Sequence, residues 1–321
     1  MSKAKEEHVK HEVKGVFDRK SIALEFKMTV DELIDFHNER CHLMERMGKS
    51  LPHYLPFVYI PAEKYRNRQN QFLKSTRLTL PKSVKNKYGV KLIYHPSRLT
   101  IHYKINTNRK NLDIVFEKEK VYVNNQEVQK VIEEFMQSVE STLYPLEVQT
   151  TNHGAMLKIK NTEEIKRRWR KDVLPKIQGY YQSEVIDSSI RKINHSIMNM
   201  NDFPYLLGQS IFYQLFCLPL YGNYSDYSKT INVSVYFSKL KMNANFIVTC
   251  TLEPEYTSSG KVLLRLKGEE ELFSHEDRKK GKLELIYKFY SDSNIIFSIT
   301  GSISTFNHDE EHRIEFNLFE L

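Results

Sequence analysis

The last third of the chain carries the pattern that most limits the possible folds. Short apolar runs follow one another there, each alternating with polar residues and separated by turns rich in Gly, Ser, Asn and Asp. Alternation with a period of two predicts strands with one buried face, and short turns between them predict antiparallel neighbours. The expected strands cover 231–237, 246–252, 262–266, 283–289, 295–304 and 314–319.

Further strands and several helices are predicted before this region. Alternating runs start at residue 92, and apolar residues at helical spacing follow them, including the single tryptophan, Trp169, which we expect to be buried. The order strands, helices, strands predicts an α+β domain over 92–321, with a mostly antiparallel curved sheet and helices packed on one face. The predicted helices cover about 126–142, 162–175, 183–200 and 203–218.

The N-terminal part of the chain shows helical rather than alternating spacing. Ser21–Phe26 places three apolar residues on one helical face. Thr29 is followed three residues later by Glu32, a capping box in which each side chain satisfies a backbone N–H at a helix start. Extended segments flank the two helices at His11–Val13 and Phe57–Ile60, so the predicted order is strand, helix, helix, strand.

The order and the residues of this stretch resemble the LysM family. In that family the first helix has a Ser-Ile-Ala core, the second begins at Thr or Ser with Glu-Leu following, and the last strand ends in Ile-Pro. The matching residues are Ser21-Ile22-Ala23, Thr29-Val30-Asp31-Glu32-Leu33, Asn38 and Ile60-Pro61. The resemblance implies a small βααβ domain over 8–63.

In the LysM family a glycan containing N-acetylglucosamine binds between the loop before the first helix and the loop after the second. The resemblance therefore implies that this module recognises such a glycan, for example peptidoglycan, or a protein surface. Both loops depart from the family, because Val16-Phe17-Asp18 stands for the usual Gly-Asp-Thr and the connection from Asn38 to Phe57 is long. The residues at the family's loop positions are Phe17, Asp18, Arg19, His37, Asn38 and Glu39.

Residues 64–91 contain basic but no acidic side chains and are predicted to form a linker between the two domains. Pro81 and Gly89 interrupt this stretch, as is typical of a solvated segment. The net charge of the chain is +8, so the basic run also fits contact with an anionic partner. Few aromatic residues lie between these charges, and no specific nucleic-acid partner is predicted.

The sequence shows no spacing of residues that is typical of catalysis. It lacks a Gly-x-Ser-x-Gly motif, a Gly-rich phosphate loop and a His-Glu-x-x-His motif. Two histidine groups, His308 with His312 and His37 with Cys41 and His42, offer too few ligands for a zinc site. The three cysteines form no spaced pair and predict reduced thiols. We therefore predict no enzymatic activity, no metal and no cofactor.

The first residues of the chain are charged throughout, and no apolar run is long enough to span a bilayer. We expect a cytoplasmic protein, with export as part of an assembly as an option. The predicted function is that of a non-enzymatic binding or adaptor protein.

Two alternatives to this function stay open. In the first alternative, the chain is a cytoplasmically made structural component of a bacterial contractile injection or phage-tail-like assembly, in which the LysM-like module docks a protein. Alternatively, it is a carrier that holds a hydrophobic ligand between the apolar stretch 203–218 and the curved sheet.

Overall fold

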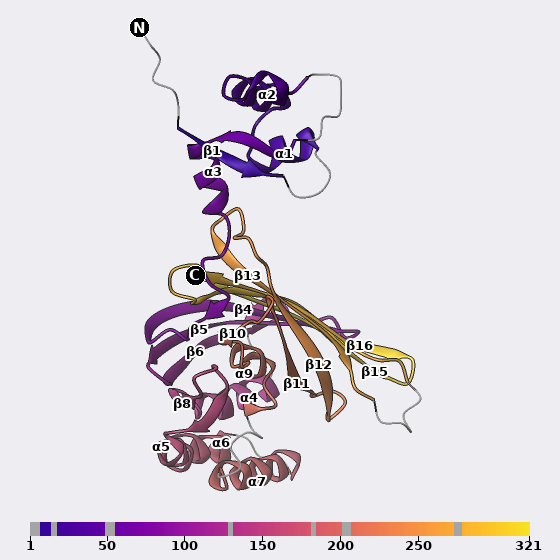
Figure 1. Cartoon of the computed structure of the whole chain (residues 1–321). Helices are drawn as coiled ribbons and strands as arrows, with labels where there is room; N and C mark the ends of the chain where they lie inside the picture. Colours follow the sequence, from indigo (N-terminus) through magenta and orange to yellow (C-terminus); the bar gives the residue numbers. More distant parts are fainter. Residues whose placement is uncertain are drawn as a thin grey trace. The chain divides into compact units, whose positions relative to one another are not determined.

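The structure, a computed structural model, describes residues 7–13, 18–48, 55–127, 131–180, 184–200, 207–272 and 278–321. Contacts along the chain divide it into two compact units, unit 1 (Met1–Lys74) and unit 2 (Ser75–Leu321) (Figure 1). Unit 1 contains a two-stranded sheet and short helices, and unit 2 contains a large sheet with several helices.

Unit 1 places helices against an antiparallel pair of strands. Its elements are β1 (His8–Glu12), α1 (Arg19–Glu25), α2 (Val30–Asn38), the 3-10 turn η1 (Leu43–Glu45), β2 (Phe57–Pro61) and α3 (Ala62–Gln69). Val9 of β1 lies opposite Ile60 of β2. The apolar faces of α1, α2 and β2 meet in one buried cluster, which includes Ile22, Phe26, Leu33, Ile34, Val58 and Ile60.

Helices α1 and α2 of unit 1 begin at side-chain caps. The backbone N–H of Thr29 donates to the Glu32 carboxylate at 2.7 Å, and the N–H of Glu32 donates to the Thr29 hydroxyl at 3.1 Å. The capping box expected at the start of α2 is therefore present. Asp18 caps α1, since its carboxylate accepts from the Lys20 N–H at 3.0 Å.

Unit 2 is organised around one open, antiparallel sheet of twelve strands. The strands of unit 2, including two that lie outside this sheet, are β3 (Arg77–Leu78), β4 (Ser83–His95), β5 (Leu99–Lys110), β6 (Asp113–Val123), β7 (Gln126–Glu127), β8 (Leu146–Thr150), β9 (Met156–Ile159), β10 (Gly222–Asn223), β11 (Ser228–Phe237), β12 (Met242–Leu252), β13 (Lys261–Glu270), β14 (Lys282–Tyr290), β15 (Ile296–Asn307) and β16 (Glu310–Glu320). The order across the large sheet is β11-β12-β13-β14-β15-β16-β4-β5-β6-β8-β9, β7 pairs with β6, and β3 and β10 form a separate pair. The meander predicted from the alternating pattern is confirmed as β11 to β16.

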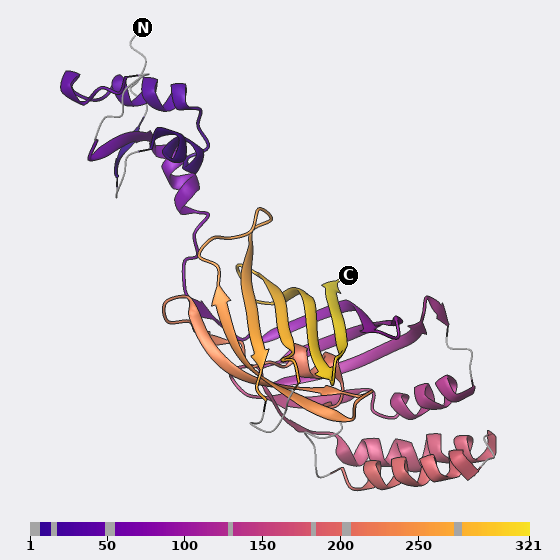
Figure 2. The same ribbon diagram turned by 90° about the vertical axis from the view of Figure 1, so that its right-hand side faces the viewer.

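The pairing of β16 with β4 joins the two halves of the sheet. Phe316 of β16 lies opposite Leu92 of β4, and both side chains are buried on the same face. The last strand of the chain therefore lies beside the first long strand of unit 2, and Figure 2 shows the continuous curved sheet that results.

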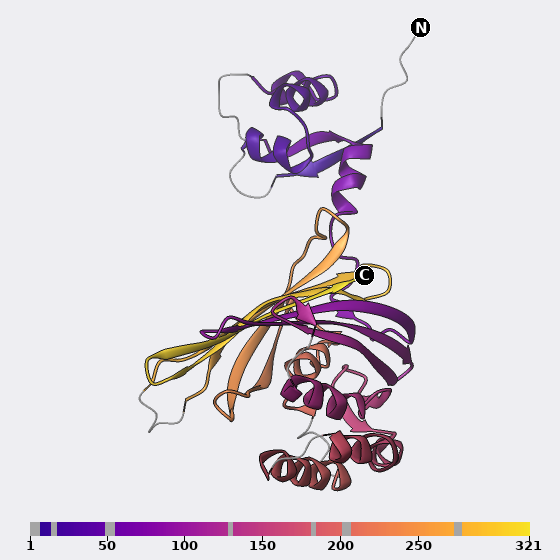
Figure 3. The same ribbon diagram turned by 180° about the vertical axis from the view of Figure 1, so that it is seen from behind.

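The helices of unit 2 lie on one side of the sheet, as the view from behind in Figure 3 also shows. They are α4 (Val131–Ser141), α5 (Thr162–Arg168), the π-helical turn η2 (Trp169–Val173), α6 (Leu174–Tyr180), α7 (Glu184–Met198) and α9 (Ile211–Phe216). Trp169 is fully buried, and its indole N–H donates to the Asn194 side-chain oxygen at 2.9 Å. The prediction of a buried tryptophan is confirmed.

Helix α9 fills part of the concave face of the sheet. The Phe212 ring contacts Phe116 edge-on, and the Phe216 ring contacts Tyr88. The Tyr287 hydroxyl donates to the Leu215 carbonyl at 2.9 Å, so that this buried polar group is satisfied. Of the stretch 203–218 predicted as a buried apolar helix, Ile211–Phe216 is helical and its rings occupy the space between helix and sheet, while residues 203–206 lie outside the described residues.

The segment predicted as a basic linker is structured. Residues 62–69 form α3 of unit 1, and Ser83–His95 form β4, a long strand within the large sheet. The division between the units falls after Lys74 instead. Val84, Tyr88 and Val90 alternate with Lys85, Lys87 and Lys91, so the lysines mark the outer face of a strand.

In the described part of the chain, no helix is long and apolar enough to cross a membrane.

Candidate functional site

The connection after α2 is the most distinctive surface of unit 1. Its described part, residues 39–48, is called the α2 loop below. Leu43 and Met44 at its η1 turn are 76% and 96% exposed, although both side chains are apolar. Two neighbouring exposed apolar side chains on an ordered turn are typical of a contact surface for a partner.

His37 anchors the α2 loop to the rest of unit 1. The residue is fully buried at the end of α2. Its Nδ1 accepts from the Tyr59 backbone N–H at 3.1 Å, and its Nε2 lies 2.9 Å from the Glu45 carbonyl oxygen. Since Nδ1 accepts, Nε2 carries the proton and donates to that carbonyl. One neutral imidazole therefore connects α2, the loop and β2.

Burial lowers the pKa of His37, because a charged imidazolium loses solvation in this interior. Protonation at Nδ1 would also remove the acceptor that the Tyr59 N–H needs. Both effects favour the neutral ring. His37 is consequently a structural residue of the loop, and neither of its ring nitrogens remains for a ligand.

Asn38 and Arg19 hold the other end of the α2 loop. The Asn38 side-chain amide donates to the Met47 carbonyl at 2.9 Å, and its oxygen accepts from the Met47 N–H at 2.7 Å. The Arg19 guanidinium donates to the Gly48 carbonyl. These contacts satisfy backbone groups of an irregular segment, which otherwise would need water or other partners.

The remaining predicted site residues lie at helix ends. Asp18 is exposed and accepts from the Ser21 hydroxyl at 2.5 Å, and this hydrogen bond is the main reason that its pKa is lowered. Glu39 is exposed and lies 3.0 Å from the Arg40 guanidinium. Phe17 lies outside the described residues. The structure therefore brings Arg19, His37 and Asn38 together at the loop as anchors, while Asp18 caps α1.

Reactive chemistry is not apparent at the α2 loop. Burial raises the pKa of the Cys41 thiol, so that this group remains protonated near neutral pH. No group of three or more His, Cys, Asp or Glu side chains suited to a metal occurs among the described residues. The loop offers apolar contact area, and hydrogen bonds from His37 and Asn38 hold its base.

Sequence reasoning missed Leu43 and Met44. Residues 39–46 read E-R-C-H-L-M-E-R, so these two are the aliphatic pair within an otherwise polar connection. That pattern was a usable signal, because an apolar pair in a charged loop is unusual unless it is buried or contacts a partner.

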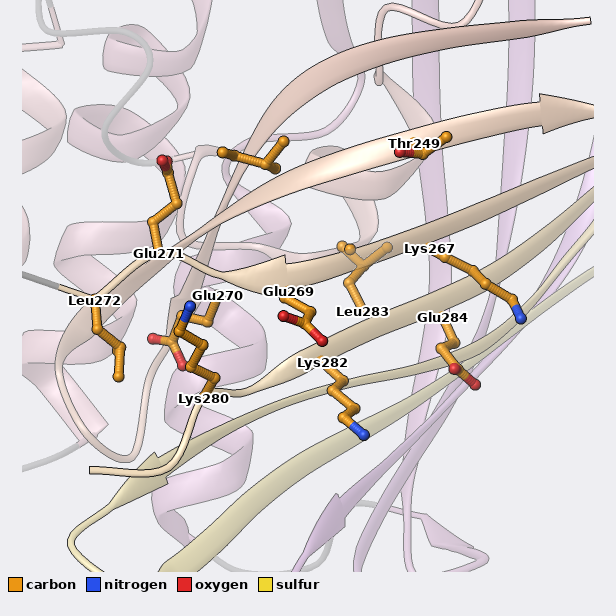
Figure 4. Close-up of a pocket in the computed structure, with 12 residues that line it drawn as sticks. Thr249, Lys267, Glu269, Glu270, Glu271, Leu272, Lys280, Lys282, Leu283 and Glu284 are labelled. Atoms are coloured by element: carbon orange, nitrogen blue, oxygen red, sulfur yellow. The ribbon is translucent and has the colours of Figure 1, made fainter. Parts of the chain in front are cut away.

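Unit 2 has a depression of about 640 Å³ on the outer face of β12, β13 and β14 (Figure 4). Its charged side chains alternate in sign across neighbouring strands. Lys267 lies opposite Glu284, and Glu269 lies opposite Lys282. Figure 4 shows each of these lysines beside its glutamate. Opposite charges on paired strands stabilise the sheet and leave little net charge for a ligand.

A buried polar network lies beside this depression. Glu270 is 1% exposed, and its carboxylate accepts from Arg278 at 2.9 and 3.1 Å, a bidentate ion pair. The Thr305 hydroxyl and the Gly281 backbone N–H donate to the same carboxylate at 2.9 and 3.0 Å. Every oxygen of Glu270 is thus satisfied within the protein, which is typical of a structural ion pair.

No family model, curated protein or solved structure matches this chain.

Proposed function

We propose that the chain is a non-enzymatic binding protein in which unit 1 acts as a LysM-like docking module for a protein partner. The observation that carries this proposal is the exposed pair Leu43 and Met44 on a loop that His37 and Asn38 hold rigid. A preorganised apolar turn loses little conformational entropy on binding, so it suits a contact with another protein surface.

The residues expected to meet a glycan are mostly engaged within the module. Sugar recognition needs free amide and polar groups together with apolar faces, and the Asn38 amide and both His37 nitrogens already have backbone partners. Protein docking is therefore favoured over glycan binding. It also agrees with the alternative in which the chain is a component of a contractile injection or phage-tail-like assembly.

Glycan binding remains the second candidate function. It is favoured by the order of β1, α1, α2 and β2 together with the LysM-like residues Ser21-Ile22-Ala23 and Ile60-Pro61. In this case peptidoglycan or a related glycan containing N-acetylglucosamine would contact the α2 loop through Leu43 and Met44.

A photo-crosslinking residue at position 44 of the full chain, used in the native cells, tests the proposal. We expect discrete protein adducts from position 44. A crosslinker at Leu24, which is 80% exposed on α1, serves as the control and should give no adduct. When protein partners are co-purified with the chain without crosslinking, the double variant Leu43→Ser/Met44→Ser should no longer retain the same partners.

Sedimentation with insoluble peptidoglycan decides between the two candidates. Protein docking predicts no retention of the full chain at high salt. Retention at high salt that Leu43→Ser/Met44→Ser abolishes would overturn protein docking in favour of glycan recognition, because salt screens only the charge contribution.

A further inference from the structure

Strands β4, β5 and β6 present excess positive charge on the outer face of the unit 2 sheet. Two adjoining depressions of about 460 and 380 Å³ lie along these strands. Five lysines and two glutamates line them, in contrast to the balanced charges of Figure 4. These residues are Lys85, Lys87, Lys91, Lys104, Lys120, Glu117 and Glu119, and the surface is called the lysine face below.

Two central lysines of this face have no carboxylate opposite them. Lys91 lies opposite His102 on one side and Asn317 on the other. Lys104 lies opposite Gly89 on β4, and on the β6 side it lies at a register shift beside Glu119 and Lys120. Both side chains are exposed. Glu119, which lines the same surface, forms a 2.5 Å ion pair with Lys87 and interacts with Lys104 only through the longer-range attraction of their charges. Within the described residues, Lys91 and Lys104 form no ion pair, so they are available to an acidic partner.

An apolar wall stands beside these two lysines. The Phe319 side chain is 48% exposed and leans across to Gly89, its partner in register. A Cβ atom at Gly89 would lie 2.7 Å from the tip of the Phe319 ring, so the glycine makes room for this ring. His102 and Tyr122 stack with their ring centres 4.9 Å apart. The lysine face therefore combines cationic and apolar contact area in one place.

We propose that the lysine face binds an acidic segment of a protein partner. An apolar side chain of that segment lies against Phe319, and carboxylates on either side of it meet Lys91 and Lys104. Charge complementarity of this kind selects partners and speeds encounter. Nucleic acid fits less well, because His102 and Tyr122 stack on each other, so the exposed Phe319 ring is not part of a row of free rings for successive bases on this face.

Fluorescence anisotropy with the full chain and a labelled peptide of repeated Glu-Glu-Leu tests this proposal. We expect Lys91→Gln/Lys104→Gln to weaken binding about fivefold or more, since two ion pairs are lost. Phe319→Ser should weaken binding of this peptide but leave an all-glutamate peptide unaffected. The matched control is Lys267→Gln/Lys282→Gln on the same face, where each lysine has a glutamate beside it; binding should stay within about twofold.

Three results would overturn the proposal. In the first, the wild-type chain does not bind the Glu-Glu-Leu peptide. In the second, the two double variants weaken binding equally, which would show that binding depends on net charge alone. In the third, an oligothymidine binds more tightly than the peptide and depends on the same lysines, which assigns the face to nucleic acid. The fluorescence of Trp169, which is buried in unit 2, verifies that each variant is folded.

Discussion

Each unit contains one buried polar side chain that forms hydrogen bonds with residues distant in the sequence, but the two side chains differ in charge. In unit 1, neutral His37 bridges the Tyr59 N–H and the Glu45 carbonyl. In unit 2, Glu270 at the end of β13 accepts from Arg278 and from the Gly281 N–H. Both residues are fully or almost fully buried. His37 is called the neutral anchor below, and Glu270 with Arg278 is called the ionic anchor.

The difference has a physical consequence for stability. An ion pair that is removed from water is costly to form, so it contributes little net free energy, but the loss of one partner leaves a buried charge uncompensated. A neutral imidazole avoids this penalty, since each nitrogen exchanges one hydrogen bond for another. The stability that the neutral imidazole contributes is instead sensitive to protonation of the ring. The ionic anchor should therefore be the more sensitive to mutation and the neutral anchor to pH.

The largest effect is expected for Glu270→Ala. Arg278 loses its carboxylate at a site where its side chain is 13% exposed, which should lower the free energy of unfolding of unit 2 by about 3–5 kcal/mol. Denaturant unfolding followed by the fluorescence of Trp169, the single tryptophan, reports on unit 2 specifically. Glu284→Ala on the exposed face is the control, and an equal loss in both variants would contradict the ionic role.

His37→Ala should destabilise unit 1 by about 2–4 kcal/mol, because it removes two hydrogen bonds and opens a cavity. The measurement is hydrogen–deuterium exchange of the full chain, in which the Tyr59 amide should lose protection. His37→Gln should recover part of the loss, as its amide offers one donor and one acceptor. Unchanged protection at Tyr59 in His37→Ala would show that the imidazole does not hold β2.

Gly281→Ala tests how tightly the ionic anchor is packed. An added Cβ atom would lie 2.0 Å from the Ser304 carbonyl oxygen and 2.8 Å from the Glu270 carboxylate. Relief of these contacts requires movement of the backbone, so we expect a loss of about 1–3 kcal/mol in the same fluorescence assay. Gly260→Ala, at a site with open space but positive φ, measures the cost of backbone strain alone. A smaller loss for Gly281 than for Gly260 would contradict close packing.

The sequence pattern predicted most of the large sheet, because alternation is a local property. β11 to β16 each have one buried face and were found for that reason. β4 has the same alternation, yet Lys85, Lys87 and Lys91 led to its interpretation as part of a charged linker. A run of charge with period two is better interpreted as the outer face of a strand.

The anchors could not be predicted in the same way, because their partners are distant in the chain. His37 depends on Tyr59, 22 positions away, and Glu270 depends on Thr305, 35 positions away. The resemblance to LysM directed attention to Arg19, His37 and Asn38, which do meet at one loop. Their burial and hydrogen bonds, however, are set by the path of the residues 39–48, for which the sequence offers no periodic signal.

The smallest and most specific effect concerns pH. The pKa of His37 is lowered by burial in the folded module, so below its ordinary value of about 6.5 the unfolded chain binds a proton that the folded chain resists. The stability of unit 1 should therefore fall as pH decreases below this value, by at most about 1.4 kcal/mol per pH unit, until the folded pKa is reached. Protection factors of the Tyr59 amide between pH 7 and 5 measure this. His37→Gln should remove the dependence, because its amide does not titrate, and a slope that persists in this variant would assign the proton to another group.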